Sequence, residues 1–326
     1  MKKFSNLNKI SSLIFLIVSL IMSDTISVCA VGDIMLGTTF PSEALPPNNG
    51  NDLFTETKAI LQSSDLTFCN LEGTFLKIGK GVSKAKTNSG NVYVFRMPPS
   101  YSKLLKDAGF DLISLANNHA NDFGDIGIKS TIKALEDQNL ICTGNESRPF
   151  KIFKCRNHSI GFCSFCLHQS FKSINQDSII TMLDSICDLV IVSFHGGAEG
   201  REHKFITKHE EIFFNESRGN PYEFARHCVD LGGDIILGSG PHVTRAVEVY
   251  RDRFIAYSLG NFCTPVWFNL NNENGIAPII KLRVNEKGKV LDYSIISICQ
   301  EKYTGPQIDH ENRALKEIEM LSRELK

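Results

Sequence analysis

The sequence lacks an excess of charge of either sign. Its 35 lysines and arginines nearly balance its 36 aspartates and glutamates, which leaves a formal net charge of -1 at pH 7. No long run of like charge interrupts this balance. Nucleic-acid binding usually leaves a basic field on a protein, so we do not expect nucleic acid as a partner.

The chain also lacks internal repeats, low-complexity segments and any shift of composition along its 326 residues. Such features would indicate a repeat protein, a disordered tail or a domain boundary. Hydrophobic residues make up 42% of the sequence, which is enough to bury a large core. We therefore expect a globular protein with a single domain over residues 23–326.

The ten cysteines do not form the dense pattern of a small secreted disulfide protein. Most occur singly inside apolar runs, which is typical of small buried hydrophobic residues in a reducing compartment. One close pair, Cys163 and Cys166, has C-x-x-C spacing, but no second pair stands at the spacing of a zinc ribbon. Strand packing explains this pair as well as a metal or redox role does.

The first 22 residues point away from a cytosolic protein. Lys2 and Lys3 precede an apolar stretch over residues 10–23 that is short for a membrane span and lacks a small-x-small cleavage site. Two interpretations stay open. The segment is a signal or anchor, which gives export or membrane association through the N-terminus, or the start is misassigned and Met22 begins a cytoplasmic protein. The cysteine usage favours the second.

Short apolar runs that end in polar or glycine-rich turns alternate with amphipathic helical patterns. This alternation is typical of an α/β domain. We expect strands over residues 25–36, 63–73, 108–119, 159–167, 186–197, 231–242 and 253–262, helices over 53–64, 98–110, 126–139 and 221–233, a hairpin over 275–298, and a terminal helix over 312–326.

Polar side chains follow five of the predicted strands within a few residues. In an open α/β sheet the carboxyl ends of the strands form the edge where ligands bind, so we expect these side chains to share a site. Carboxylate, amide and imidazole groups are ligands for divalent Mn, Fe or Zn, and one or two such ions activate water against a phosphoryl group. The residues are Asp33, Glu72, Asn118 with His119, His195 and His242.

Six ordered motifs carry a family resemblance: VGDIMLG, NLEGTF, LANNHANDFG, VSFHGGAE, GPHV and YSLGNF. They closely resemble the capsule-synthesis CapA family, also called the poly-γ-glutamate synthesis proteins, a branch of the calcineurin-like metallophosphoesterases. The resemblance runs from about residue 26 to residue 262. It implies an α/β fold with four layers, an α/β/β/α sandwich, and a metal site at the sheet edges.

The resemblance also implies residue roles. His119 would be the catalytic imidazole, able to protonate a leaving oxygen. The implied metal ligands are Asp33, Glu72, Asn118, His195 and His242, with Asn70 beside Glu72 in the loop of the bridging carboxylate. Residues that would support these ligands or contact the substrate are Asn117, Asp122, Glu199, His203, Arg245 and Asn261. Among them, the charge of Arg245 suits a bidentate contact with a substrate anion.

Two departures from the family pattern weaken the implied site. Phosphoesterases usually have His two residues after the first Asp, where this chain has Met35. Near the last motif, Ser239 and Gly240 stand where CapA relatives often have histidines. On the implied geometry the losses fall on different metals, so each ion would keep fewer protein ligands, completed by water, Glu199 or His203.

Simpler interpretations exist for each motif taken alone. Asp33 would cap a turn, residues 116–122 would form a turn rich in Asn and Asp, and His195 would be a core histidine. Two functions therefore stay open. The protein is a metal-dependent phosphoesterase, or it is a non-hydrolytic accessory protein of polyanion or capsule synthesis. Either would bind an anionic or phosphorylated small molecule or polymer.

Overall fold

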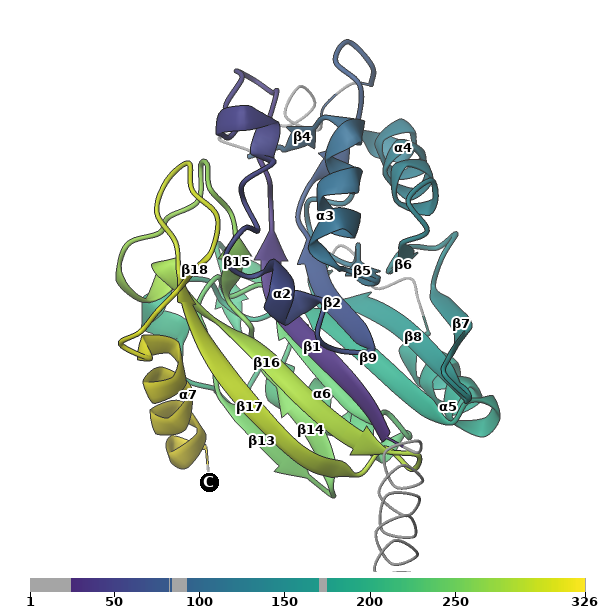
Figure 1. Ribbon diagram of the computed structural model, residues 1–326. Coiled ribbons are helices and arrows are strands. Elements are labelled where there is room, and N and C mark those ends of the chain that lie inside the picture. Colours follow the sequence, from purple (N-terminus) through teal and green to yellow (C-terminus); the bar gives the residue numbers. More distant parts are fainter. Residues whose placement is uncertain (1–24, 82, 84–92, 170–174, 326) are drawn as a thin grey trace, which may run out of the picture.

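A computed structural model describes residues 25–81, 83, 93–169 and 175–325. Two large β-sheets pack face to face, and helices cover their outer faces (Figure 1). The predicted four-layer α/β/β/α sandwich is therefore confirmed. The hydrophobic segment over residues 1–22 lies outside the described residues. Among the helices that are described, none combines the length and the apolar character needed to cross a bilayer.

The first sheet has eight strands, with β1 at its centre. Strands β2, β5, β6 and β15 run parallel to β1 along the sheet, and the hairpin of β16 and β17 continues it in the antiparallel sense. The strands are β1 (Thr25–Ile34), β2 (Leu66–Leu71), β5 (Leu112–Ser114), β6 (Ile141–Thr143), β15 (Asn261–Cys263), β16 (Ile276–Asn285), β17 (Val290–Cys299) and β18 (Gln307–Ile308).

The second sheet has six strands in the order β13-β14-β12-β9-β8-β7. The four inner strands are parallel, and the two edge strands are antiparallel to their neighbours. The strands are β7 (Phe150–Cys155), β8 (His158–Cys166), β9 (Leu189–His195), β12 (Ile235–Ser239), β13 (Val247–Tyr250) and β14 (Arg253–Ala256). Two short pairs lie outside the sheets: β3 (Thr74–Phe75) with β4 (Arg96–Met97), and β10 (Ile212–Phe213) with β11 (Glu216–Ser217).

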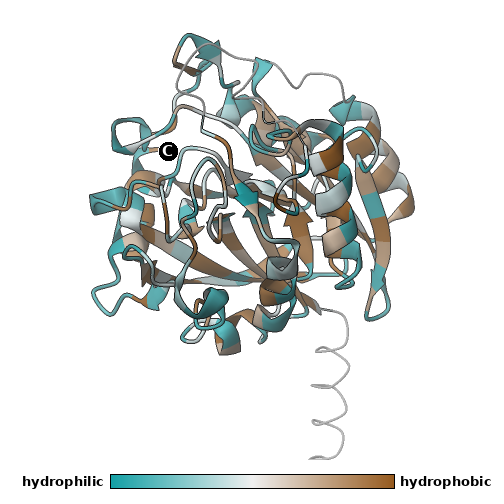
Figure 2. Ribbon diagram, turned by 90° about the horizontal axis from the view of Figure 1, so that it is seen from above, coloured by the Kyte–Doolittle hydropathy of each residue, from teal (hydrophilic) through white to brown (hydrophobic). Residues whose placement is uncertain are grey.

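Alternate side chains of the two sheets meet in one buried cluster. Val28 and Phe68 of the first sheet pack toward Phe162 and Leu189 of the second, and the Phe68 and Phe162 rings lie 6.1 Å apart. The other faces of the same strands pack against helices. Because both faces are buried, the strands appear in the sequence as continuous apolar runs. Figure 2 shows the hydrophobic colour concentrated on the strands inside the sandwich.

Helices complete the two outer layers. Leu105 and Leu135 pack on the first sheet, whereas Leu183 and Ala225 pack on the second. The last helix lies at the edge of the sandwich, with Ile318 in the cluster between the sheets. On the first sheet lie α2 (Lys58–Leu61), α3 (Ser102–Ala108) and α4 (Gly124–Glu136), on the second α5 (Gln176–Ile186) and α6 (Pro221–Asp230), and at the edge α7 (Arg313–Glu324).

Most predicted elements agree with the structure within a few residues, but the strand expected over 253–262 is two strands, β14 and β15, that belong to different sheets, and β6, β7 and β13 were not predicted. Two helices also differ from the prediction. Only residues 58–61 of the helix predicted over 53–64 are α-helical, and α5 was not predicted. All ten cysteines are free, and burial raises the pKa of the Cys163 thiol above its ordinary range. Cys163 and Cys166 lie three residues apart in β8, so they point to opposite faces, which favours strand packing over a shared ion.

Candidate metal centre

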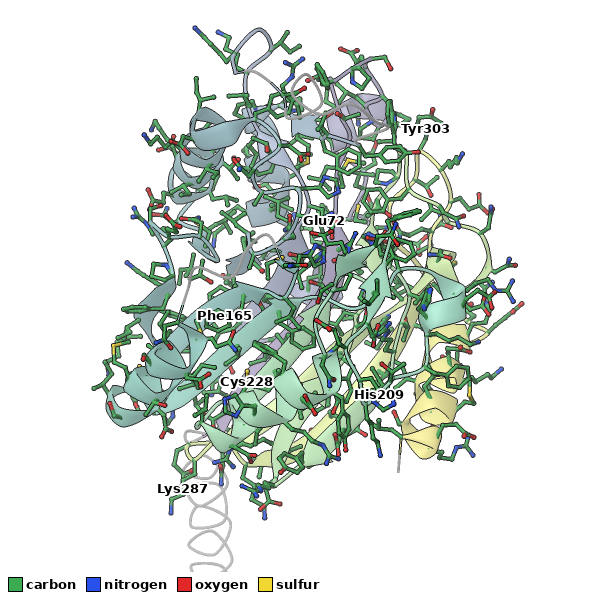
Figure 3. All side chains as sticks on the ribbon, turned by 180° about the vertical axis from the view of Figure 1, so that it is seen from behind. Glu72, Phe165, His209, Cys228, Lys287 and Tyr303 are labelled. Atoms are coloured by element: carbon green, nitrogen blue, oxygen red, sulfur yellow. The ribbon has the colours of Figure 1, made fainter. Side chains whose placement is uncertain are left out.

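The carboxyl ends of the parallel strands converge on one rim of the sandwich. Asp33 at the end of β1 stands opposite Asn70 of β2, and His195 at the end of β9 stands opposite Ser239 of β12. Each strand therefore delivers its polar residue to the place where the two sheets meet. Glu72 lies in the crowded group of nitrogen and oxygen atoms at this rim (Figure 3).

Asp33, Glu72 and His242 form the centre of the site. One ligand atom from each lies within 4.8 Å of the others. His242 Nδ1 is 3.0 Å from Asp33 Oδ2, and its Nε2 is 3.9 Å from Glu72 Oε2. The two carboxylates are fully buried. Two buried carboxylates and an imidazole are a donor set that suits a divalent cation.

The backbone of His242 is held in the left-handed region, with φ of +56°. A non-glycine residue is uncommon there, and such conformations cluster at functional sites. Two amide groups hold the strained peptide, because Asn261 Nδ2 and Asn274 Nδ2 donate to the His242 carbonyl at 3.2 and 3.0 Å. Asn261 Oδ1 also lies 3.2 Å from His242 Nδ1, so this predicted residue does reach the site.

Asn70 and Asn117 form an amide network beneath the trio. Asn70 Nδ2 donates to Asp33 Oδ1 at 2.8 Å and to Glu72 Oε1 at 3.3 Å. Asn117 Nδ2 in turn donates to Asn70 Oδ1 at 3.0 Å. These bonds fix the orientation of both carboxylates. Because the amide groups carry no charge, they do not neutralise the negative charge of Asp33 and Glu72. Asn118 follows Asn117 in the same loop and is half-buried.

His195 adjoins the trio from the second sheet. Its Nδ1 lies 3.4 Å from Glu72 Oε1 and 3.1 Å from Ser239 Oγ. Because the Ser239 hydroxyl donates to the Phe194 carbonyl at 3.1 Å, it accepts from Nδ1–H, which leaves Nε2 of His195 with a lone pair. Burial lowers the pKa of His195, and neighbouring imidazoles add to this effect, so the ring stays neutral as a ligand must be.

His119 is oriented by a separate carboxylate. Its Nδ1 lies 3.1 Å from Asp122 Oδ2, which also accepts from the Phe95 amide at 2.6 Å. The Phe95 ring packs on the imidazole with ring centres 4.5 Å apart. Asp122 thus fixes the tautomer of His119 with the hydrogen on Nδ1, and Nε2 is left to exchange a proton.

The charges of the trio are poorly balanced. Burial raises the pKa of Glu72 well above its ordinary value, and the nearby Asp33 carboxylate raises it further. Burial alone would lower the pKa of His242, but Glu72 and Asp33 raise it to about 10. Glu72 Oε2 has no hydrogen-bond partner among the described residues although it is buried. An orphaned carboxylate oxygen between acidic and imidazole groups fits a bound cation.

Glu199 and His203 were expected to complete a ligand set. In the described residues, one group of His, Cys, Asp and Glu side chains is close enough together to hold a metal ion, and it does not include these two. Glu199 is instead paired with Arg218, whose Nη1 lies 2.8 Å from Glu199 Oε1. The His203 ring packs against Phe213 with centres 5.9 Å apart. Met35 is buried with Phe95 and Val266, so an apolar cluster occupies the place of the missing histidine.

The structure corrects the expectation that Arg245 binds a substrate anion. Its guanidinium is fully buried and donates to Glu211 Oε1 and Oε2 at 3.0 and 2.8 Å and to the Ala198 carbonyl at 3.1 Å. Arg245 therefore holds the loop that follows His195. Because the ion pair forms between residues distant in sequence, spacing gave no sign of it.

Sequence reasoning missed His168. This buried histidine directly follows the β8 run, its ring centre lies 5.2 Å from that of His195, and its Nε2 accepts from Arg218 Nη1 at 3.2 Å. The rule that identified the other residues, a polar side chain just behind an apolar run, applies to it equally. The cysteine pair in the same run masked this signal, because its spacing suggested a different kind of site.

Known proteins resemble this chain in sequence or in fold. Capsule biosynthesis protein CapA of Bacillus anthracis is 28% identical over 265 residues, which cover 74% of this chain and 60% of that protein. PGA biosynthesis protein CapA of Bacillus subtilis (strain 168) is 28% identical over 264 residues, which cover 73% and 63%. The chain thus spans less than two thirds of the length of these relatives.

Solved structures include a hypothetical protein from Thermus thermophilus, with a TM-score of 0.50, 18% identity, and coverage of 83% of this chain and 98% of that one. The calcineurin-like phosphoesterase YfkN of Bacillus subtilis gives 0.45 at 14% identity, with 92% and 97% covered. At 18% identity, the likeness to the Thermus thermophilus protein shows a shared fold and nothing more.

The sequence model of the bacterial capsule synthesis protein PGA_cap family matches residues 27–265. With well over half of its 326 residues matched, the chain belongs to that family.

Proposed function

We propose that the protein is a metal-dependent hydrolase of phosphoesters. The single observation that carries the proposal is the buried trio of Asp33, Glu72 and His242, with one carboxylate oxygen that has no hydrogen-bond partner in the described chain. Burying two adjacent carboxylates with one imidazole costs free energy unless a cation compensates their charge. A purely structural role does not explain this cost.

Asp33, Glu72 and His242 would hold the ion, with His195 and Asn118 as further ligands from the same rim. The donor types suit Mn, Fe or Zn. A bound ion of this kind lowers the pKa of a coordinated water and polarises a phosphoryl oxygen. The chain presents one such three-residue group in its described part, which supports one ion more strongly than two.

The residues of the chain supply positioning and proton transfer. Asn70, itself fixed by Asn117, keeps both carboxylates aimed at a common point. His119, held by Asp122 at 3.1 Å, would donate a proton to the leaving oxygen from Nε2. Because Phe95 covers the imidazole, the proton transfer would occur in a partly water-excluded environment.

The names of the two relatives place them in capsule and PGA biosynthesis. We extend this process to the present chain, with an anionic or phosphorylated molecule as substrate and membrane association through residues 1–22. A non-hydrolytic accessory role is the second candidate. It is favoured by the apolar cluster around Met35 and by Ser239, which hydrogen-bonds His195 where relatives have a further histidine.

Metal content and turnover of the purified full chain separate these functions. The hydrolase should retain Mn, Fe or Zn after dialysis and cleave an aryl phosphodiester. Asp33→Ala and His195→Ala should lose both properties, because each removes a donor. His119→Ala should keep the metal and lose at least about a hundredfold in kcat, as expected for a general acid.

His310→Ala provides the matched control, because His310 is exposed in the turn before α7. It should match the unmodified chain in metal content and rate. Metal retained without turnover on any phosphoester would support the accessory role. Metal content unchanged in Asp33→Ala would refute the metal centre itself.

A further inference from the structure

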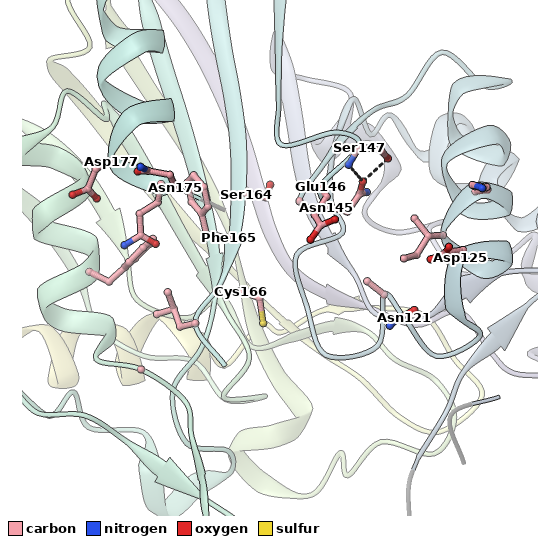
Figure 4. A pocket seen from close by; sticks show the side chains of 18 of the residues that line it. Asn121, Asp125, Asn145, Glu146, Ser147, Ser164, Phe165, Cys166, Asn175 and Asp177 are labelled. Atoms are coloured by element: carbon pink, nitrogen blue, oxygen red, sulfur yellow. Dashed lines mark hydrogen bonds between the residues drawn. The ribbon is translucent and has the colours of Figure 1, made fainter. Parts of the chain in front are cut away.

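A large cleft opens beside the metal centre, between the two sheets. Its volume is about 940 Å³, in the range of sites that hold ligands of several rings. One wall comes from the loops around α4 and β6, and the other from the end of β8 and the beginnings of α5 and α6 (Figure 4). Ala120 and Asn121 of the lining follow His119 in the chain, and Cys166 of the lining stands opposite His195 in the paired strands β8 and β9, so the cleft adjoins these two histidines. Asp33, Glu72 and His242 themselves do not line it.

The polar lining is rich in carboxamides, whose amide groups donate hydrogen bonds. The oxygens of Asn145, Asn175 and Asn220 already accept bonds from the chain itself. Five carboxamides line the cleft: Asn121, Asn145, Asn175, Gln176 and Asn220. Figure 4 shows Asn121 and Asn145 on one wall and Asn175 on the other. Ser147 adds an exposed hydroxyl group, whereas the Ser164 hydroxyl is buried against Thr143 and Ser193. Phe165, Leu167 and Phe224 add apolar side chains to the lining. Such a mixture matches hydroxyl groups at the edges of sugar rings and their apolar faces.

The formal charge of the described lining is negative. Asp125, Glu146 and Asp177 contribute three carboxylates, whereas Lys129 is the one cation among these lining residues. Three exposed carboxylates are partly screened by solvent, so their effect on a single charge is small, but it adds up over a ligand with many charges. A polyanion would meet repulsion along this cleft.

Helix N-termini do not reverse this charge. Three helices, α4, α5 and α6, begin at the cleft, and free N–H groups there would attract anions. However, Asn175 accepts from the Ser178 amide at 3.1 Å and Asn220 accepts from the Glu223 amide at 3.2 Å. The first turns of the three helices also carry Asp125, Asp177 and Glu223. The chain's own side chains therefore already occupy the positive ends of α5 and α6, and Asp125 in the first turn of α4, which has no side-chain cap, opposes anion binding there.

We propose that this cleft binds a neutral oligosaccharide and disfavours polyanions. The inference rests on the proposed function only for the reacting end of the ligand: the group to be hydrolysed would lie at the Asp33, Glu72 and His242 trio while the sugar chain fills the cleft. A polyglutamate chain would then not be the part of the substrate that this cleft recognises.

Calorimetric titration of the full chain in EDTA tests the proposal without metal or turnover. The probes are maltotetraose, cellotetraose and N-acetylated chitotetraose as neutral chains, and a γ-linked glutamate hexamer as the polyanion. At least one neutral tetrasaccharide should bind at least tenfold more tightly than the hexamer. Asn121→Ala and Gln176→Ala should each weaken its binding at least threefold. Gln138→Ala, two residues beyond the C-terminal end of α4, should not.

Charge reversal gives the second arm. The double substitution Glu146→Lys with Asp177→Lys should strengthen hexamer binding at least tenfold at low salt, less at high salt, and change tetrasaccharide binding less than threefold. Failure of all three tetrasaccharides to bind, or tighter binding of the hexamer to the unmodified chain, would overturn the proposal. Sugar binding without phosphoester turnover would instead refute the proposed hydrolase and leave the cleft assignment intact.

Discussion

At the scale of single residues, two buried carboxylates at opposite ends of the sandwich differ in what compensates their burial. Asp234, just before β12, accepts from the Val190 amide at 2.8 Å and pairs with Arg253 at 2.7 Å. Glu72, beyond the carboxyl end of β2, has an oxygen with no hydrogen-bond partner in the described chain. The first arrangement is structural, and the second fits a bound cation.

The Asp234 pair predicts a specific dependence of stability on pH. Burial raises the pKa of Asp234 to about 6 from 3.8, although the Val190 amide and Arg253 act against it. Between these pH values the folded state binds more protons than the unfolded state, so the free energy of unfolding falls as pH rises. Asp234→Asn removes this titration.

We therefore expect the stability of the unmodified chain, relative to Asp234→Asn, to fall by on the order of 2 kcal/mol between pH 4.5 and pH 7. Urea unfolding at four pH values across this window measures it. Glu286→Gln, at the hairpin turn between β16 and β17, is the control and should run parallel to the unmodified chain. A constant difference between Asp234→Asn and the unmodified chain would show that burial does not shift this carboxyl.

At the scale of elements, two glycines in the central strands allow close approach at the rim. A Cβ at Gly32 of β1 would lie 1.9 Å from the Gly260 carbonyl oxygen, and one at Gly238 of β12 would lie 2.3 Å from that of Tyr257. Both neighbours are backbone atoms, which cannot move aside as flexible side chains do. The position of Asp33 therefore depends on the absence of a side chain at the residue before it.

Gly32→Ala and Gly238→Ala should each lower the free energy of unfolding by about 3 kcal/mol, because the strand or its neighbour must shift. Gly32→Ala should also lose bound metal. Gly79→Ala is the control, since its added Cβ meets nothing within 4 Å and only the positive φ of +80° opposes it. That control should cost about 1 kcal/mol. Equal costs in urea unfolding would contradict the steric argument.

Strands were predictable from sequence where both faces are buried, as in β1 and β9, because burial leaves a continuous apolar run. Helix α5 was not predicted, although Asn175 caps it and Ile179, Ile180 and Leu183 carry helical spacing. Its isoleucines are equally typical of a strand, so local preference did not identify it. The helix expected over residues 53–64 is shorter because turns replace its first part. Tertiary packing, which the local pattern does not contain, decided both.

At the scale of the whole molecule, the convergence of Asp33, Glu72 and His242 was predictable because parallel strands must present their carboxyl ends at one edge. The ion pair of Arg245 and the position of His168 beside His195 were not predictable. Both depend on side chains brought together from separate loops. The cleft was equally hidden from local patterns, because its walls come from both sheets and three helix beginnings.

A resident cation should stabilise the entire fold, since the unfolded chain does not hold the three donors together. At a metal concentration of about 100 times Kd the expected gain is about 2.7 kcal/mol. Calorimetric scans of the EDTA-treated full chain should therefore show Tm rising with added Mn or Zn. The same titration on Asp33→Ala should leave Tm unchanged. A rise of equal size in both proteins would indicate binding elsewhere.

The trio draws Asp33 and Glu72 from one sheet and His242 from the other, so its span depends on how far apart the sheets are kept. Contacts such as that of Phe68 with Phe162 set this spacing from deep inside the molecule. The packed interior thus sets the distance between the three ligands. A change of side-chain volume there would alter the affinity for a cation, although the changed side chain does not contact the cation.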